Sequence, residues 1–455
     1  MSKKEQILIL SLGGSPEPLI YSIKEFKPDK VVFLCSPQTL KECDGILEET
    51  AFNEENVEIY EIPDAESLDD SFSTSKKVLS KFADDGFEVR VDFTGGTKPM
   101  VSGLVLAVIE GNYSNFKFSY VGQKDSQSRT KNGVGVVKDG SEITKMQINP
   151  YKKYAITEFK RGKNFFNTYQ FEAALENFQS AKSRFIKGTE QRRISEIYER
   201  IVILYQKWDL FEDKVSKNTD LFKYLGFIIN DIEKDEFILN EFENIDFFIQ
   251  MKRNYEFLSF KIRGVSYDSE DPSIKGHLKF RISYYLSDLF NNAYRRIEEG
   301  KYDDAVARLY RINELIAQVQ LTQKGLIDDD QLQTQKEFKV NISSTKSKAH
   351  ARDNYDEILD FIDYNSSLKE KNKGYFGIAN DKSYELLDLF GIKQSPKFDK
   401  LNSKLKERNG SILAHGLKPM NKKKAEELYD KTLDYAKDYF SFLDEDMDLA
   451  KFPKF

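Results

Sequence analysis

Over the first 150 residues of this 455-residue chain, two patterns of apolar residues follow one another in turn. Short apolar runs rich in β-branched and aromatic residues are separated by segments in which apolar residues recur every three or four positions. The apolar runs are 6–12, 30–35, 57–62, 88–93 and 117–121, and the clearest helical patterns are 68–82 and 100–110. This alternation predicts an α/β domain, in which helices cover a parallel β-sheet.

Turn-forming pairs mark the end of this α/β region. Asn132-Gly133 precedes the run Val134–Val137 and Asp139-Gly140 follows it, which predicts a terminal hairpin. After Pro150, glycines and β-branched runs become sparse, and Lys, Glu, Phe and Tyr recur at helical spacing. We therefore predict an all-α region from Tyr151 onward.

Two segments of the helical region, 169–178 and 301–310, resemble single helix hairpins of the tetratricopeptide type. No copies lie between them, so the pattern does not indicate a tandem array. The polar stretch 341–348 predicts a loop before a last helical unit. The expected organisation is an α/β domain at 1–150, a helical region at 151–340 and a final helical domain at 341–455.

Glycine-rich loops follow the first and fourth predicted strands. Ligands of parallel sheets bind beyond the carboxyl ends of the strands, and exposed amides at helix N-termini favour anions. We expect the two loops to form one pocket that suits the ribose and phosphate edges of a nucleotide. The predicted lining is Gly13, Gly14, Ser15, Thr94, Gly95, Gly96, Thr97 and Lys98. The alternative is that these glycines only form tight turns. The sequence lacks the GxGxxG fingerprint and the GK[ST] motif, which disfavours NAD or ATP.

A second candidate site lies near the C-terminus, where Arg408-Asn409 is followed by His415. In a helix, Arg408 and His415 would share one face with Leu401, Leu405 and Ile412 and would lie roughly 10 Å apart. An unpaired buried charge is costly, so this mixed stripe predicts an interface that holds a polar ligand. The alternative is a chance spacing on an ordinary helix.

The chemistry of this second site suits RNA cleavage. Histidine moves protons near neutral pH, and arginine binds phosphate oxygens through its fork of N–H donors. With no carboxylate cluster or cysteine nearby, the 2′-hydroxyl of RNA itself would be the nucleophile, and no metal ion would be needed. Between residues 397 and 424, basic residues far outnumber acidic ones, in a chain of formal net charge -6. This local excess predicts a polyanionic partner, although a solvated helix face would show the same pattern.

Composition disfavours a membrane protein, a disulfide-rich protein and a metal-binding protein. No apolar run approaches the roughly 20 residues that span a bilayer, so we expect a cytoplasmic protein with no membrane partner. Cys35 and Cys43 are too few for a disulfide framework or a four-ligand zinc site, and no metal-binding motif is present in the sequence. His277 and His350 have no catalytic neighbours in the sequence.

Both candidate sites resemble known motifs. Arg408-Asn409 followed by His415 resembles the arginine–histidine signature of HEPN ribonucleases, in the version found in CRISPR-associated effectors. The loops at 12–18 and 92–99 resemble those of the CARF domain, a Rossmann-like sensor of cyclic oligoadenylates. The two motifs in this order, in a chain of this length, are similar to the Csm-type ancillary ribonucleases of type III CRISPR systems.

The resemblance implies a Rossmann-like CARF domain at 1–150, a helical linker region at 151–340 and a HEPN domain at 341–455. It implies a homodimeric, metal-independent single-stranded endoribonuclease of antiviral defence, activated by cyclic oligoadenylate and needing no other cofactor. On family grounds, cyclic tetra-adenylate is favoured over hexa-adenylate, and no stable association with the interference complex is expected. His415 would act as acid or base, Arg408 would hold the scissile phosphate and Asn409 would orient the 2′-hydroxyl or phosphate. Slow ring-nuclease activity in the CARF domain would use the hydroxyls of Ser15, Thr94 and Thr97 to position a 2′-hydroxyl.

Two other functions fit parts of the pattern. The first is a non-catalytic, ligand-responsive regulator that holds nucleic acid with its basic C-terminal segment without cutting it. The second is a small-molecule enzyme built on the N-terminal sheet, with the helices as a dimer scaffold.

Overall fold

The computed structural model describes most of the chain, and it separates into two compact units. Residues 4–84, 86–124, 129–131, 134–137, 140–242, 246–263, 278–327, 339–341, 356–357, 360–361, 375–377, 380–408 and 418–455 are described. The first unit is Met1–Thr157 and the second is Glu158–Phe455. Among the described residues, none of the helices combines the length and the hydrophobicity that crossing a membrane requires.

A six-stranded sheet with the order β3-β2-β1-β4-β5-β8 forms the centre of the first unit. Its strands are β1 (Glu5–Leu12), β2 (Lys30–Cys35), β3 (Val57–Glu61), β4 (Phe87–Asp92), β5 (Phe116–Gln123) and β8 (Glu142–Gln147). The first five are parallel, as the apolar runs predicted, whereas β8 pairs antiparallel with β5 at the edge. The predicted hairpin is confirmed as β6 (Arg129–Lys131) paired with β7 (Val134–Val137).

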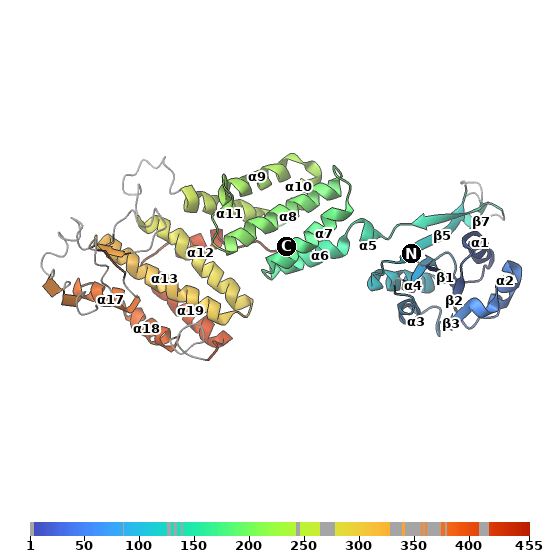
Figure 1. The fold of residues 1–455 in the computed structure, drawn as a ribbon, viewed down its shortest axis with the longest axis horizontal. Coiled ribbons are helices and arrows are strands. Elements are labelled where there is room, and N and C mark those ends of the chain that lie inside the picture. The colour runs from blue at the N-terminus through green and yellow to red at the C-terminus, as the bar shows by residue number, and fades with distance from the viewer. Residues whose placement is uncertain are drawn as a thin grey trace. The chain divides into compact units, whose positions relative to one another are not determined.

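Helices cover both faces of this sheet (Figure 1). Because successive strand residues point to opposite faces, β1 contributes Ile7 and Ile9 to one core and Leu8 and Leu10 to the other. The first core is closed by α3 (Leu68–Ser80) and α4 (Lys98–Gly111), and the second by α1 (Glu17–Phe26) and α2 (Glu42–Thr50). This is the predicted Rossmann-like arrangement of the N-terminal domain.

In the part of the second unit that the structure describes, helices are accompanied by two short strand pairs, which the all-α prediction missed. The strand pairs are β9 (Lys214–Ser216) with β10 (Thr219–Asp220), and β11 (Lys339–Asn341) with β12 (Tyr375–Gly377). The helices described are α6 (Ile156–Asn167), α7 (Phe171–Arg184), α8 (Glu190–Asp209), α9 (Leu221–Lys234), α10 (Glu236–Phe242), α11 (Asp246–Arg263), α12 (Leu278–Glu298), α13 (Tyr302–Gln323), α17 (Asn380–Leu389), α18 (Pro396–Arg408), α19 (Lys422–Ala436) and α20 (Leu443–Leu449). The segments predicted as helix hairpins fall at the α6–α7 and α12–α13 turns.

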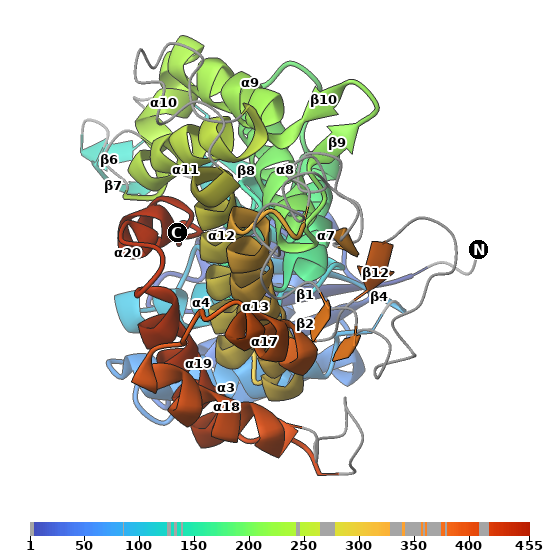
Figure 2. The same ribbon diagram turned by 90° about the vertical axis from the view of Figure 1, so that its left-hand side faces the viewer.

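Two hydrophobic cores fill this helical unit. One lies among α6–α11 and is rich in phenylalanine and tyrosine, and the other lies among α12, α13, α17, α18 and α19. Figure 2 shows α12 and α13 side by side, with α17, α18 and α19 packed around them. The second core includes Leu309 as well as Leu428. It therefore spans the position 340/341, where the sequence pattern placed a domain boundary.

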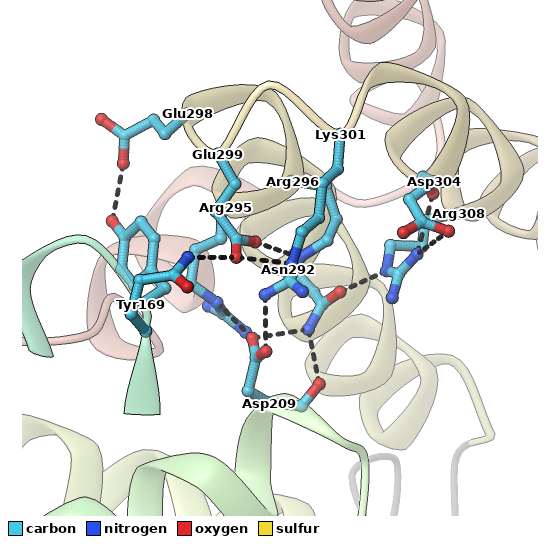
Figure 3. Close-up of polar contacts among 11 residues, drawn as sticks. Tyr169, Asp209, Asn292, Arg295, Arg296, Glu298, Glu299, Lys301, Asp304 and Arg308 are labelled. Carbon is cyan, nitrogen blue, oxygen red and sulfur yellow. Dashed lines mark hydrogen bonds and ion pairs between the residues drawn. The ribbon is translucent and has the colours of Figure 1, made fainter. Parts of the chain in front are cut away.

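A buried network of charges joins the two cores (Figure 3). Asp209, the last residue of α8, accepts hydrogen bonds from Asn292, Arg295 and Arg296 of α12 at 3.0, 2.8 and 2.5 Å. Arg308 of α13 in turn donates to Asn292. Removing one partner from a buried, paired group leaves an uncompensated charge, so such a network fixes the end of α8 against α12.

The last residues of the chain are hydrogen-bonded to helices of the first of these two cores. Asn254 of α11 donates to the carbonyls of Leu449 and Lys451 at 2.7 and 2.9 Å. The side chain of Asn167 binds both the N–H and the C=O of Phe455, at 2.8 and 3.2 Å. The segment after α20 is therefore tied to the α6–α11 helices by its main chain.

Candidate functional site

The two glycine-rich loops lie side by side at the carboxyl edge of the sheet. β1 pairs with β2 on one side and with β4 on the other, so the chain winds outward in opposite directions from β1 and β4. The loops after β1 and β4 therefore meet at the topological switch point, where open α/β sheets bind their ligands. The predicted juxtaposition of residues 13–15 with residues 94–98 is thus observed.

The two loops are in contact through their backbones. A Cβ atom on Gly13 would lie 2.6 Å from the amide nitrogen of Gly96, and one on Gly95 would lie 2.5 Å from the carbonyl oxygen of Ser11. The Ser11 hydroxyl donates a hydrogen bond to the Gly95 carbonyl. Gly96 has φ +101°, a conformation that other residues rarely adopt. At these positions glycine is required by close approach as well as by turn geometry.

Gly13→Ala should destabilise the N-terminal unit while Gly14→Ala should not. The added methyl group at Gly13 has no space, and overpacking of this kind costs about 1–3 kcal/mol. The same methyl group at Gly14 would meet nothing within 4 Å, which makes Gly14→Ala the matched control. Differential scanning calorimetry of the full chain measures the effect. Equal transition temperatures for the two variants would show that the loops do not pack as described.

The side chain of Asp92 holds the second loop in place through hydrogen bonds. This carboxylate, 1% exposed at the end of β4, accepts hydrogen bonds from the hydroxyls of Ser22 and Ser119, both at 2.9 Å. It also accepts from the amide and the hydroxyl of Thr94, at 3.0 and 2.5 Å. Four donors thus satisfy one buried carboxylate that makes no ion pair at contact distance among the described residues. Pattern analysis did not select Asp92, although an acidic residue ending an apolar strand was a visible signal.

The predicted ligand-binding side chains divide into two groups. The hydroxyl of Thr94 donates to Asp92 and accepts from the Val121 amide at 2.7 Å, so it is fully used inside the protein. The hydroxyl of Thr97 donates to the Ala65 carbonyl and accepts from the amide of Met100, in the first turn of α4. These contacts argue against a part for Thr94 or Thr97 in activator degradation.

Ser15 and Lys98 belong to the second group. Both side chains are exposed and make no hydrogen bond or ion pair with any residue that the structure describes. Lys98 is the first residue of α4, directly after the second glycine-rich loop. Together with the exposed backbone of Gly14, these groups form a surface suited to phosphate and ribose oxygens.

The C-terminal motif is only partly within the described residues. α18 ends at Arg408, and Asn409 and His415 lie outside the described residues. Leu401 and Leu405, which we expected to line an interface, are 0% and 3% exposed and belong to the core that α18 shares with α13 and α19. That expectation was wrong, because neighbouring helices of the same chain already cover these side chains.

The basic segment at 397–424 is partly neutralised by α19. Lys397 pairs with Asp434 and Asp438 at 3.0 and 2.7 Å, and Lys404 pairs with Glu427 at 3.5 Å. Hydrogen bonds to Asp438 and Asp434 raise the pKa of Lys397, and the same contact lowers the pKa of Asp438. The positive charge available to a polyanion is therefore smaller than the lysine count suggests. Within the described ranges, no cluster of three or more His, Cys, Asp or Glu side chains could hold a metal ion.

Residues 274–438 match the family model described as the Csm6 HEPN domain. The match contains Arg408, Asn409 and His415, and it begins at the segment that leads into α12. A HEPN domain in the C-terminal part of the chain is thereby confirmed, and with it the resemblance of this part to Csm-type ribonucleases. A comparison with curated proteins found no match.

Solved structures similar to this chain include two bound to cyclic nucleotides. Csm6 of Enterococcus italicus, bound to cyclic hexa-2′-fluoro-hexa-dAMP, has 14% identity and a TM-score of 0.46, and the alignment covers 98% of this chain and 100% of that one. Can2 of Sulfobacillus thermosulfidooxidans, in complex with cyclic tetra-adenylate, has 12% identity and a TM-score of 0.24, covering 45% and 67%. The protein VC1899 of Vibrio cholerae has 8% identity and a TM-score of 0.24, covering 65% and 68%.

Proposed function

We propose, from the Csm6-type HEPN domain that this chain carries, that it is an endoribonuclease switched on by a cyclic oligoadenylate. The observation that carries the proposal is the match of residues 274–438, which includes the arginine, asparagine and histidine selected from the sequence. The loops at the sheet's switch point supply the second half of the proposal, a site for a ligand with several phosphates.

The proposed reaction needs no metal ion. His415 takes the proton from the 2′-hydroxyl or gives one to the leaving 5′-oxygen, while Arg408 holds the phosphate oxygens. The 2′-oxygen forms a bond to phosphorus as the bond to the 5′-oxygen breaks, leaving a 2′,3′-cyclic phosphate and a 5′-hydroxyl. Asn409 orients the 2′-hydroxyl or the phosphate. Two copies of the chain form the complete cleft, so the active species is a homodimer acting on single-stranded RNA.

The proposed activator lies at the carboxyl edge of the sheet. Lys98 contacts a phosphate, Ser15 contacts a ribose or phosphate oxygen, and the amides of residues 13–14 and 95–97 complete the site. Of the two ring sizes held by the similar structures, we propose cyclic tetra-adenylate ahead of hexa-adenylate. Switching from mostly inactive to mostly active needs about 5.5 kcal/mol of preferential binding to the active state, which a ligand with several phosphates can supply.

RNA cleavage should persist in excess EDTA and should leave a 2′,3′-cyclic phosphate. The reason is that the nucleophile comes from the RNA and the proposed site offers no cluster of carboxylates for two metal ions. End-group analysis of the products decides the chemistry. Products with a 5′-phosphate, or activity that is lost on chelation and restored by magnesium, would contradict the proposed mechanism.

A further inference from the structure

A cavity of about 740 Å³ opens between α17 and α18. Its lining includes the rings of Tyr310, Tyr384 and Phe398 and the polar side chains of Asp388, Asp399 and Asn402. Cavities of roughly 300–1,000 Å³ with apolar walls and a few placed polar groups are typical of sites for small ligands or parts of larger ones. Of the residues proposed to take part in the reaction, none belongs to this lining.

The cavity lies directly along the helix that carries the proposed catalytic arginine. Asp399, Asn402 and Leu405 line it at intervals of three residues, so one face of α18 forms its wall. Arg408 follows Leu405 by the same interval on the same helix. At 1.5 Å of rise per residue, the lining begins about 5 Å from Arg408 along the helix axis and ends about 14 Å from it. A group bound here would therefore lie near the end of α18 at which Arg408 stands.

Three of the polar side chains in the cavity are available to a ligand. Asp388, Asp399 and Asn402 make no side-chain hydrogen bond or ion pair with the described residues. Gln394, also in the lining, is by contrast hydrogen-bonded to other side chains of the protein. Its amide donates to Gln320 at 3.2 Å and accepts from the hydroxyls of two tyrosines at 2.7 and 2.9 Å. Asp388 and Asp399 are exposed and Asn402 is half-buried, so the three side chains offer two carboxylates and an amide to a ligand that enters the cavity.

The lining of this cavity is acidic. It contains the carboxylates of Asp381, Glu385, Asp388 and Asp399 and the cation of Lys393, so it disfavours a phosphate and favours a nucleobase. Carboxylates repel a phosphodiester but accept hydrogen bonds from ring N–H and amino groups, and aromatic rings give bases a surface to pack against. Uracil has no amino group, and its ring N3–H lies between two carbonyl oxygens that the carboxylates of Asp388 and Asp399 would repel. Adenine, guanine and cytosine each bring an amino donor.

We propose that the α17–α18 cavity holds a base of the RNA next to the scissile phosphate and selects amino-bearing bases over uracil. The proposal rests on the proposed ribonuclease function and assigns Asp399 and Asn402 as residues that determine specificity. The basic side chains outside the cavity hold the backbone, while the cavity reads the base.

The test is a map of all cleavage positions in one unstructured RNA of mixed sequence, made by sequencing the product ends. For the wild-type protein, we expect uridine to be disfavoured at one of the two positions that flank the cut. Asp399→Asn and, separately, Asn402→Ala should reduce that discrimination about tenfold, the effect of losing one good contact to a base edge. Asp430→Asn removes an exposed carboxylate of α19 outside the cavity and should leave the map unchanged.

Asp399 also lies in the first turn of α18, where a negative charge stabilises the helix. Thermal unfolding of each variant separates this effect, and Asn402→Ala carries the test if Asp399→Asn melts early. A folded variant that cleaves with the wild-type base preference would overturn the cavity proposal and leave the ribonuclease function standing. A wild-type map without base preference at either flanking position would likewise overturn the cavity proposal alone. Failure of the wild type to cleave RNA with any activator would overturn the proposed function and this inference with it.

Discussion

His415→Ala should abolish RNA cleavage while leaving the fold and activator binding intact. The substitution removes the proposed proton-transfer group, and the loss of such a group lowers rates by roughly 10²- to 10⁴-fold. The measurement is single-turnover cleavage of a labelled single-stranded RNA at saturating activator. Activator binding by calorimetry on the same sample shows whether the N-terminal unit is unaffected.

His350→Ala is the matched control. It makes the same chemical change at a histidine that no arginine–asparagine pair precedes. The control should cleave at the wild-type rate. Near-normal cleavage by folded His415→Ala protein, free of contaminating nuclease, would remove His415 from the mechanism.

The central strands of the first unit could be predicted because each is buried on both faces. Lys30–Cys35 is a strand in the structure with the predicted bounds, and five of its six residues are fully covered. β8 could not be predicted in the same way. Its sequence, Glu142–Gln147, is mostly polar and exposed, since it lies at the edge of the sheet and is held there by backbone hydrogen bonds to β5. Backbone pairing of this kind leaves little trace in an apolar pattern.

The organisation of the helical unit depends on contacts between distant residues. Each helix could be recognised from its spacing, but nothing local shows that α12 and α13 share a core with α17–α19. The buried pairing of Asp209 with Arg295 joins residues 86 positions apart, and both side chains look like ordinary surface charges in the sequence. Periodicity identifies which face of a helix is apolar, and it does not identify the helix that covers it.

The ligand loops show which part of a site a sequence can reveal. Glycines at two strand ends correctly predicted that the two loops meet, because close backbone approach at Gly13 and Gly95 requires glycine. The roles of the hydroxyl side chains were not accessible from spacing. The hydroxyl of Thr94 is held inside the protein because it donates to Asp92. This role becomes visible only in the three-dimensional arrangement of four donors around that carboxylate.

Lys98→Ala should shift activation to about 10- to 100-fold higher activator concentration without lowering the plateau. Lys98 is the one cation among the predicted ligand-binding residues, and a hydrogen bond to a charged group contributes roughly 1.5–3 kcal/mol. The catalytic cleft is unchanged, so saturating activator should still select the active state. The measurement is the rate of RNA cleavage against activator concentration.

Lys77→Ala is the control for this titration. Lys77 is an exposed lysine in the last turn of α3, and the chain of that helix leads away from the carboxyl edge of the sheet. Its replacement removes the same charge and should leave the midpoint in place. An unchanged midpoint with a lowered plateau for Lys98→Ala would show that Lys98 acts in transmission or folding and not in ligand capture.

The proposed function is tested most directly by measuring RNA cleavage against activator concentration for the wild-type protein, in excess EDTA, with cyclic adenylates of three to six units. We predict negligible cleavage of single-stranded RNA without activator and saturable cleavage with one ring size, cyclic tetra-adenylate. Cleavage that is independent of every ring, or no cleavage with any of them by folded protein that binds one, would contradict a ribonuclease controlled by a cyclic oligoadenylate.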